Sequence, residues 1–258
     1  MTPKIVAFVN ADYIPVARNW MLALKAIGRD KDAVVVSLDE ETRAAFLPAQ
    51  VLHRPLALDS SNLAPLWVHR IGVLRELLSS GVAVIHSDVD ALWLRDPLPD
   101  IERCETPVVF SQGTIWPPDV HAIHRVVLCC GFFYLAAQPE VVAFLDAAED
   151  QIQADKDDQV AVNRVVVNMI DSWRISNPYR IMFRNTYFLA SSSTIRSITE
   201  SGQRDTLPIS VLPHHAYPRL LDKLTKDMVV VHPLSGKTCA EKRDCFKLLG
   251  LWNAASDL

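Results

Sequence analysis

Two carboxylates at the end of an apolar run are the strongest chemical feature of this sequence. Asp88 and Asp90 stand between the largely apolar segments 82–86 and 91–94. Paired carboxylates on a loop suit a hard divalent cation, which prefers oxygen ligands and keeps coordination places for phosphate oxygens. We expect a turn at Asp88 that brings the two carboxylates together beyond the end of the strand. The alternative is a strand end followed by a solvated acidic turn.

Polar residues also follow other strand-like runs. Asn10, Asp12 and Tyr13 come after an N-terminal apolar run, and His232 closes another near the C-terminus. In open α/β sheets, ligands bind beyond the carboxyl ends of the strands. These residues are therefore expected to converge with the two carboxylates on one site.

The elements that position these residues alternate between strand-like runs and segments with helical spacing of apolar residues. The expected strands are 5–9, 33–37, 82–86, 108–111, 126–136 and 228–232, and the expected helices are 13–27, 63–78, 141–151, 158–170 and 239–249. Alternation of this kind predicts parallel strands joined by crossover helices. The predicted fold class is α/β, with a mixed, mostly parallel central sheet flanked by helices in a single domain over 1–258.

Composition and charge limit the function classes. Half of the 258 residues are hydrophobic and the formal net charge is -4, so a surface built to neutralise nucleic-acid phosphates is not expected. No apolar run approaches the roughly 18–20 residues that span a bilayer. The N-terminus runs into a strand-like segment and lacks the pattern of a signal peptide. We expect a cytoplasmic protein without a transmembrane segment; peripheral membrane contact and the loss of an anchor stay open.

Five cysteines form an odd set without zinc-finger spacing. The adjacent Cys129 and Cys130 lie in an apolar run. Free cysteine is often buried, so reduced buried thiols are the favoured interpretation, with metal or redox use as the alternative.

The segment His86–Leu98 resembles the signature of nucleotide-diphospho-sugar transferases, and in particular the retaining family that includes plant cell-wall xylosyltransferases and arabinosyltransferases. Further matches follow in the expected order: Cys130-Gly131-Phe132-Phe133-Tyr134, Asp158-Gln159 with Asn163, and Val231-His232-Pro233 with Gly236, Lys242 and Leu251-Trp252. The resemblance implies a GT-A fold and transfer with retention at the anomeric carbon. It also implies a nucleotide-binding part over about 1–110 and an acceptor and catalytic part over about 111–258.

The resemblance implies a ligand set for Mn²⁺ or Mg²⁺. Asp90 would bind the ion directly, Asp88 would meet both the ion and the ribose, and His232 would be the third protein ligand. An imidazole suits Mn²⁺ better than Mg²⁺, which keeps oxygen and water neighbours. The alternative for His232 is a hydrogen-bonded histidine at a buried strand end.

Transfer leaves a nucleoside diphosphate with extra negative charge, which a divalent ion and nearby basic groups would stabilise. The candidate basic groups are Lys237, Lys242 and Arg70, although Arg70 could equally be a surface residue on a polar helix face. Gly236 could let backbone N–H groups approach a phosphate. By the same resemblance, Asn10, Asp12 and Tyr13 would bind the nucleotide base and ribose, although Asn and Asp also favour turns.

Asp158 and Gln159 are the candidate catalytic residues. By resemblance, Asp158 would bind hydroxyls of the donor sugar and Gln159 would lie near its anomeric carbon. Asp158 could also serve the N-terminus of a helix, where a carboxylate is favourable. Gln159 is a poor nucleophile, so attack from the side of the leaving group is favoured over double displacement.

The donor is expected to be a nucleoside-diphosphate sugar, with uridine diphosphate as the commonest carrier in this fold. The acceptor could be a glycan, a glycolipid, a protein or a small molecule. The sequence offers only loop residues as acceptor contacts, among them Asp119, His121, His124, His214, His215 and Tyr217, each of which could be ordinary loop structure.

Three alternatives remain in view. A phosphohydrolase or phosphotransferase of the haloacid dehalogenase type also places Asp-x-Asp after a strand. Its pair is normally followed by small residues and lies near the chain start, whereas Ala91-Leu92-Trp93 follows here. A glycosidase takes its two carboxylates from separate strands several ångströms apart. A non-catalytic sugar-nucleotide binding module would not need all of Asp88, Asp90, Asp158, Gln159 and His232.

Overall fold

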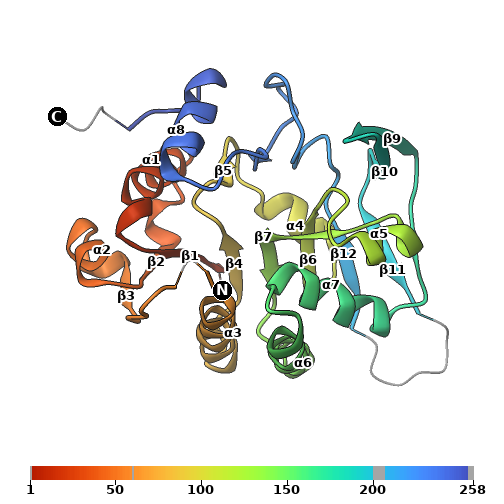
Figure 1. Ribbon diagram of the computed structural model, residues 1–258, viewed down its shortest axis with the longest axis horizontal. Helices are drawn as coiled ribbons and strands as arrows, with labels where there is room; N and C mark the ends of the chain where they lie inside the picture. Colours follow the sequence, from red (N-terminus) through yellow and green to blue (C-terminus); the bar gives the residue numbers. More distant parts are fainter. Residues whose placement is uncertain (1, 60, 200–206, 255–258) are drawn as a thin grey trace.

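One continuous sheet runs through the computed structural model, which describes residues 2–59, 61–199 and 207–254 (Figure 1). Within those residues its nine strands lie in the order β3-β2-β1-β4-β7-β6-β12-β11-β8. Their bounds are β1 Lys4–Val9, β2 Ala33–Ser37, β3 Val51–His53, β4 Val84–Ser87, β6 Val108–Gln112, β7 Leu128–Leu135, β8 Ser172–Arg174, β11 Ile195–Ile198 and β12 Ile209–Val211.

The sheet is mixed, and its two halves differ. β1 pairs in parallel with β2 and β4, and β2 pairs in parallel with β3, as expected for strands joined by crossover helices. β7 lies antiparallel between β4 and β6, and β12 is parallel to β6. Beyond β12, β11 and β8 pair antiparallel. The carboxyl ends of β1 and β4 therefore meet at one edge, beside the start of β7.

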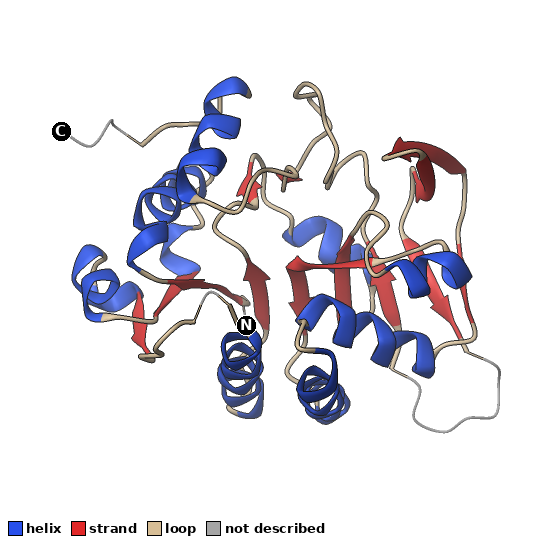
Figure 2. Cartoon of the chain, in the orientation of Figure 1, coloured by secondary structure: helices blue, strands red, loops and turns tan. Residues whose placement is uncertain are grey.

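Helices cover both faces of the sheet (Figure 2). One face buries apolar side chains from α3, α6 and α7, and the other buries side chains from α1, α4 and α8. The helices are α1 Ile14–Ala26, α2 Glu40–Ala45, α3 Ala64–Ser79, α4 Leu98–Cys104, α5 Pro118–His124, α6 Pro139–Asp155, α7 Asp158–Met169 and α8 Cys239–Leu248, with short 3₁₀ turns at Ala11–Tyr13, Asp30–Asp32 and Pro48–Gln50.

Two small antiparallel pairs lie outside the main sheet. β5 (Leu92–Trp93) pairs with β13 (Val230–Val231), which joins the acidic segment to the C-terminal part of the chain. β9 (Pro178–Phe183) and β10 (Thr186–Ser191) form a hairpin. No helix in the described part of the chain combines the length and apolar character needed to cross a membrane.

The long elements agree closely with the sequence predictions. The strand expected at 33–37 is β2, and the helices expected at 63–78 and 158–170 are α3 and α7. The strand expected at 228–232 is shorter and covers only Val230–Val231, because its partner β5 offers two residues for pairing. α2, α4 and α5 were not predicted, since helices of six or seven residues do not complete two turns of apolar periodicity.

Asn163 fastens α7 to the central strand β7. Its Oδ1 accepts from the backbone N–H of Leu128 at 2.8 Å, and its Nδ2 donates to the carbonyl of Leu128 at 3.0 Å. Both groups are buried, so the side chain satisfies a backbone donor and acceptor that water cannot reach. This contact fixes the position of the first turn of α7 relative to β7.

Asn163→Ala is expected to lower the free energy of unfolding by about 2–4 kcal/mol, because it leaves two buried backbone groups without partners. Urea unfolding monitored by circular dichroism would measure the loss. The control is Asn168→Ala on the exposed side of the same helix, which should change stability by less than about 0.5 kcal/mol. Equal stability of the two variants would contradict the anchoring role of Asn163.

Candidate active site

The turn that the sequence predicts at Asp88 is present at the end of β4. The N–H of Asp88 donates to the carbonyl of Gly131 at 2.8 Å, and the N–H of Ala91 donates to the carbonyl of Asp88 at 2.9 Å. Beneath the turn, Ser87 Oγ accepts from the indole N–H groups of Trp20 at 3.2 Å and Trp93 at 3.1 Å. The turn brings the two carboxylates of Asp-x-Asp to one side of the chain.

His232 reaches the carboxylates through the small β5–β13 sheet. Val231 pairs with Leu92, and the N–H of His232 donates to the carbonyl of Pro218 at 3.1 Å. His232 Nε2 then lies 3.3 Å from Asp90 Oδ1 and 3.9 Å from Asp88 Oδ2. One ligand atom from each of these three residues falls within 4.8 Å of the others. We call Asp88, Asp90 and His232 the carboxylate–histidine cluster.

Gly131 on β7 provides the space for this cluster. A Cβ at this position would lie 2.1 Å from His232 Cε1 and 2.6 Å from Asp88 Oδ2. Both separations are far below van der Waals contact, so any side chain here would displace the imidazole or the carboxylate. The glycine is needed for close approach, since its φ is not among the positive values of the chain.

Basic side chains compensate the carboxylates of Asp88, Asp90 and Asp158. Lys242 Nζ contacts Asp90 Oδ2, and one terminal nitrogen of Arg70 lies 3.8 Å from Asp88 Oδ1 while the other contacts Asp158 Oδ2. Arg70 is only 4% exposed, so its alternative as a surface residue is wrong. Its guanidinium also stacks on Trp67, with 4.8 Å to the ring centroid. Arg70 therefore links the cluster to the start of α7.

The electrostatics favour ionised carboxylates. Burial would raise the pKa of Asp90, but His232 and Lys242 outweigh burial and hold that pKa far below its usual value. Burial likewise opposes ionisation of Asp88, and the hydrogen bond from His86 with the charge of His232 lowers the pKa of Asp88. Burial and Arg219 lower the pKa of His232, yet Asp90 raises it to about 9. The two carboxylates are therefore ionised, and a cation bound to the imidazole of His232 would replace its proton.

His86 is a neighbour of the cluster that the sequence prediction did not single out. Its Nε2 lies 3.1 Å from Asp88 Oδ1 and 3.2 Å from a terminal nitrogen of Arg70, and its ring lies 4.8 Å from that of Phe133. Burial and the Arg70 charge lower the pKa of His86, so the ring is a neutral support for Asp88. Its position two residues before Asp88 on β4 is the signal that could have identified it.

Asp158 and Gln159 open α7 beside the cluster. The side chain that caps the helix is Asp157, whose Oδ1 accepts from the N–H of Val160 at 2.8 Å. Asp158 is the first residue of α7, so its carboxylate lies at a helix N-terminus as the sequence alternative expects, and it also contacts Arg70. Gln159 Nε2 donates to the carbonyl of Trp116 at 2.9 Å, and its Oε1 accepts from the N–H of Cys130 at 3.4 Å.

Some of the residues expected to bind the nucleotide contact one another. The hydroxyl of Tyr13 donates to the carbonyl of Lys237, which brings the turn after β1 next to the loop before α8. Asn10 Nδ2 donates to Asp12 Oδ2 at 3.3 Å, and both side chains are solvent-accessible. Lys237 is exposed, and in the described part of the chain the ion pairs of the carboxylate–histidine cluster do not include it.

Asp39 is a support of this region that sequence reasoning missed. Its Oδ2 accepts from the N–H of Ala11 at 2.7 Å, and its Oδ1 accepts from the N–H of Thr42 at 2.8 Å as the N-cap of α2. One carboxylate thus fixes both the turn after β1 and the next helix. The signal was an Asp shortly after the predicted strand 33–37 and directly before Glu40 and Glu41, because Asp is a favoured N-cap and acidic residues are enriched in the first turn of a helix.

Gly236 has a structural explanation. A Cβ there would lie 2.0 Å from Glu241 Cδ, because the Glu241 carboxylate folds back over the loop. Thr238 and Glu241 form a capping box at the start of α8, in which each side chain bonds the other's backbone N–H. The capping box aligns α8 so that Lys242 reaches Asp90. Backbone binding of a phosphate at Gly236 stays a prediction.

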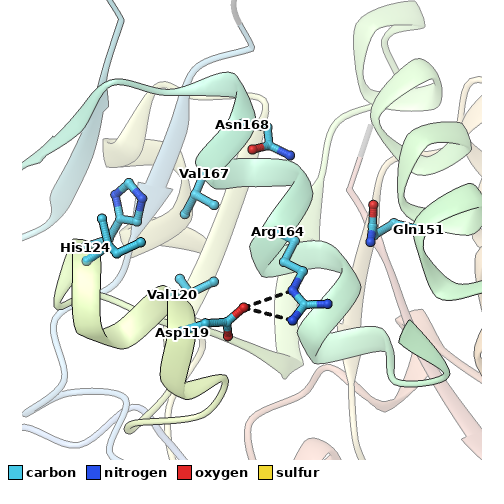
Figure 3. A pocket seen from close by; sticks show the side chains of 8 residues that line it. Asp119, Val120, His124, Gln151, Arg164, Val167 and Asn168 are labelled. Atoms are coloured by element: carbon cyan, nitrogen blue, oxygen red, sulfur yellow. Dashed lines mark hydrogen bonds and ion pairs between the residues drawn. The ribbon is translucent and has the colours of Figure 1, made fainter. Parts of the chain in front are cut away.

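Figure 3 draws a pocket of about 230 Å³ between α5, α6 and α7. Asp119 and His124, two candidate acceptor contacts, line it with Arg164. Arg164 is paired with Asp119 at 2.9 Å and also contacts Asp155, so its charge is matched within the protein. No lining residue belongs to the carboxylate–histidine cluster.

The other candidate acceptor residues divide by burial. Tyr217 is 2% exposed and donates to Asp100 Oδ2 at 2.6 Å, so it is a core residue and its interpretation as an acceptor contact is wrong. His214 is buried, its ring lies 5.4 Å from that of Phe188, and its Nε2 accepts from the N–H of Arg219 at 3.2 Å. His215 is exposed.

Comparison with known proteins places this geometry in context. The family model for nucleotide-diphospho-sugar transferases matches residues 30–232, a range that includes the whole carboxylate–histidine cluster with Asp158 and Gln159. The turn after β1 and the start of α8 lie outside the matched range. No curated protein sequence matches the chain.

Among solved structures, the galactosyltransferase LgtC in complex with donor and acceptor sugar analogs aligns with 99% of this chain and 97% of its own, with a TM-score of 0.52 and 10% identity. This alignment shows a shared GT-A fold. An active-site mutant of LgtC aligns over 63% of this chain and 70% of its own, at a TM-score of 0.41 and 13% identity. The bifunctional glycosyltransferase WbbM aligns over 64% of this chain and 37% of its own, with a TM-score of 0.39 and 10% sequence identity.

Gly131→Ala is expected to weaken Mn²⁺ binding by roughly tenfold or more, because the added methyl displaces His232 or Asp88 from the cluster. Titration of free Mn²⁺ by electron paramagnetic resonance would measure the affinity. Gly72→Ala is the matched control, since a Cβ there meets nothing within 4 Å. Unchanged Mn²⁺ affinity in a folded Gly131→Ala protein would show that the cluster is not the binding site.

Proposed function

The chain belongs to the nucleotide-diphospho-sugar transferase family, and from this premise we propose that it moves a sugar from a nucleoside-diphosphate sugar to a hydroxyl acceptor in a metal-dependent reaction. The observation that carries the metal dependence is the carboxylate–histidine cluster at the carboxyl end of β4. Family membership makes the chain a glycosyltransferase, so the phosphohydrolase and non-catalytic alternatives are not supported.

The residues of the cluster fit a divalent cation. Two carboxylates and one imidazole offer hard oxygen ligands and a single nitrogen, a set that favours Mn²⁺ over Mg²⁺. The missing side chain of Gly131 is what allows His232 and Asp88 to approach each other. A divalent ion held by Asp88, Asp90 and His232 would stabilise the negative charge that builds on the departing nucleoside diphosphate.

The basic residues around the cluster would act on the same charge. Lys242 and Arg70 each contact a carboxylate of the cluster or of α7, so both are placed to bind phosphate oxygens beside the ion. Tyr13, Asn10 and Asp12 would bind the base and ribose, for which a uridine nucleotide is our proposal. This assignment rests on their position after β1, where they adjoin the loop that carries Lys237.

Asp158 and Gln159 would serve the donor sugar. Asp158 lies next to Arg70 and would accept hydrogen bonds from sugar hydroxyls. The carboxamide of Gln159 is engaged at both ends by backbone groups, which favours a positioning role over nucleophilic attack. We therefore favour retention by attack from the side of the leaving group, with the departing phosphate accepting the proton of the acceptor hydroxyl. The acceptor as a glycan, glycolipid or small molecule stays a prediction, as does the cytoplasmic location.

A screen of nucleoside diphosphates and nucleotide sugars by thermal shift, with and without Mn²⁺, tests the proposal. A ligand at about 100 times its Kd stabilises the folded state by about 2.7 kcal/mol, which is several degrees for a chain of this size. We expect the largest shift with a uridine nucleotide in the presence of Mn²⁺. The absence of any shift with nucleotides, both with and without Mn²⁺, would contradict the donor assignment.

Asp90→Asn is expected to reduce transfer or hydrolysis of the preferred nucleotide sugar by about a hundredfold or more, because it removes one charged ligand without changing side-chain volume. Product formation measured by chromatography would check this, with circular dichroism to confirm folding. Asp96→Asn is the control, since Asp96 pairs with Arg29 at 2.9 Å outside the cluster. Equal activity of the two variants would remove Asp90 from the metal site.

A further inference from the structure

Two adjacent cysteines on β7 have different surroundings. Cys129 Sγ lies 3.7 Å from His232 Nδ1, on the side of the strand that carries the carboxylate–histidine cluster. Cys130 Sγ lies 3.9 Å from the backbone carbonyl of Asp158, toward α7. Both side chains are at most 4% exposed. The sequence alone predicted only buried thiols, but the structure separates their roles.

Both ring nitrogens of His232 have neighbours, and the Cε1 side of the ring packs against Gly131. Nε2 faces Asp90 at 3.3 Å and Asp88 at 3.9 Å, while Nδ1 faces the Cys129 sulfur. On the Cε1 edge, the ring passes so close to Gly131 that a Cβ there would lie 2.1 Å away. Rotation of the ring by half a turn about its Cβ–Cγ bond would place a carbon against the sulfur and lose this contact.

A histidine that binds a metal through one nitrogen is normally oriented by a hydrogen bond at the other. We propose that Cys129 is the positioning residue for His232: its sulfur accepts a hydrogen bond from Nδ1–H and so directs the Nε2 lone pair toward the cation. The inference rests on the proposed function, because it assumes that the carboxylate–histidine cluster binds a divalent ion. Cys129 itself does not touch the ion or the substrate.

The chemistry of the thiol suits this task. Sulfur is a weak acceptor with a long reach, which matches a separation of 3.7 Å inside an apolar strand. Valine has a similar shape but accepts no hydrogen bond, so Cys129→Val removes the contact and preserves packing. Serine retains an acceptor. The neighbouring Cys130→Val supplies a matched control, because it makes the same substitution on the opposite side of the strand.

The test is Mn²⁺ binding to the otherwise metal-free protein, measured by electron paramagnetic resonance, together with the thermal midpoint of each variant. We expect Cys129→Val to weaken Mn²⁺ binding by roughly tenfold, while Cys130→Val and Cys129→Ser stay within about threefold of the wild type. The thermal midpoints of the two valine variants should be similar. Cys129→Ala is measured beside Cys129→Val, so that a failure of the valine variant to fold leaves the test intact.

Each outcome has a separate meaning. Unchanged Mn²⁺ affinity in Cys129→Val or Cys129→Ala, with wild-type binding intact, would overturn the positioning role and leave Cys129 as a packing residue. An equal loss in Cys129→Val and Cys130→Val would also overturn it, because the effect would then come from the strand and not from the contact with His232. If the wild-type protein binds no Mn²⁺, the proposed metal site fails before Cys129 is at issue.

Discussion

The mutual repulsion of two neighbouring carboxylates, the buried Asp90 and the Asp88 side chain that is 40% exposed, is the constraint that the rest of the site must satisfy. Solvent screens part of this repulsion at Asp88, and cationic groups of the protein have to offset the rest because water does not reach Asp90 freely. The turn at Asp88 creates this repulsion, and cationic groups from three distant segments offset it: Arg70 from α3, His232 after β13 and Lys242 from α8. The fold therefore has to place cationic side chains at the end of β4 as well as bury its apolar side chains.

β7 is the strand that contacts the turn at Asp88, His232 and α7 together. It borders β4, so its Gly131 carbonyl anchors the turn while the absent Gly131 side chain makes room for His232. On its other side, Leu128 is clamped by Asn163, which sets the start of α7. Because the same strand contacts both partners, the distance between the carboxylate–histidine cluster and Gln159 depends on the strand's backbone and not on flexible loops.

The sequence could predict the parts of this arrangement that repeat along the chain. β2 follows from an unbroken apolar run, α3 follows from the helical spacing of its apolar residues, and the turn at Asp88 follows from two carboxylates placed at a strand end. Contacts between distant segments carry no such pattern. Nothing local distinguishes Tyr217, a core residue bonded to Asp100, from an exposed loop tyrosine. Nothing in the sequence next to Gly236 indicates that the carboxylate of Glu241 fills the space beside it.

The region outside the family match completes the site by packing the two ends of the chain together. Asn19 of α1 is fully buried and bonds the segment after α8: its Nδ2 donates to the carbonyl of Leu251 at 3.0 Å, and its Oδ1 accepts from the N–H of Asn253 at 2.6 Å. These bonds hold α8 against α1 from its C-terminal side, while the capping box fixes its start. Lys242 projects from α8 between the capping box at its start and the segment bonded to Asn19 after its end. The contact between Lys242 and Asp90 therefore depends on residues that touch neither side chain. The contact of Lys242 with the proposed metal ligand Asp90 thus depends on hydrogen bonds between side chains and backbone groups on either side of it along the chain.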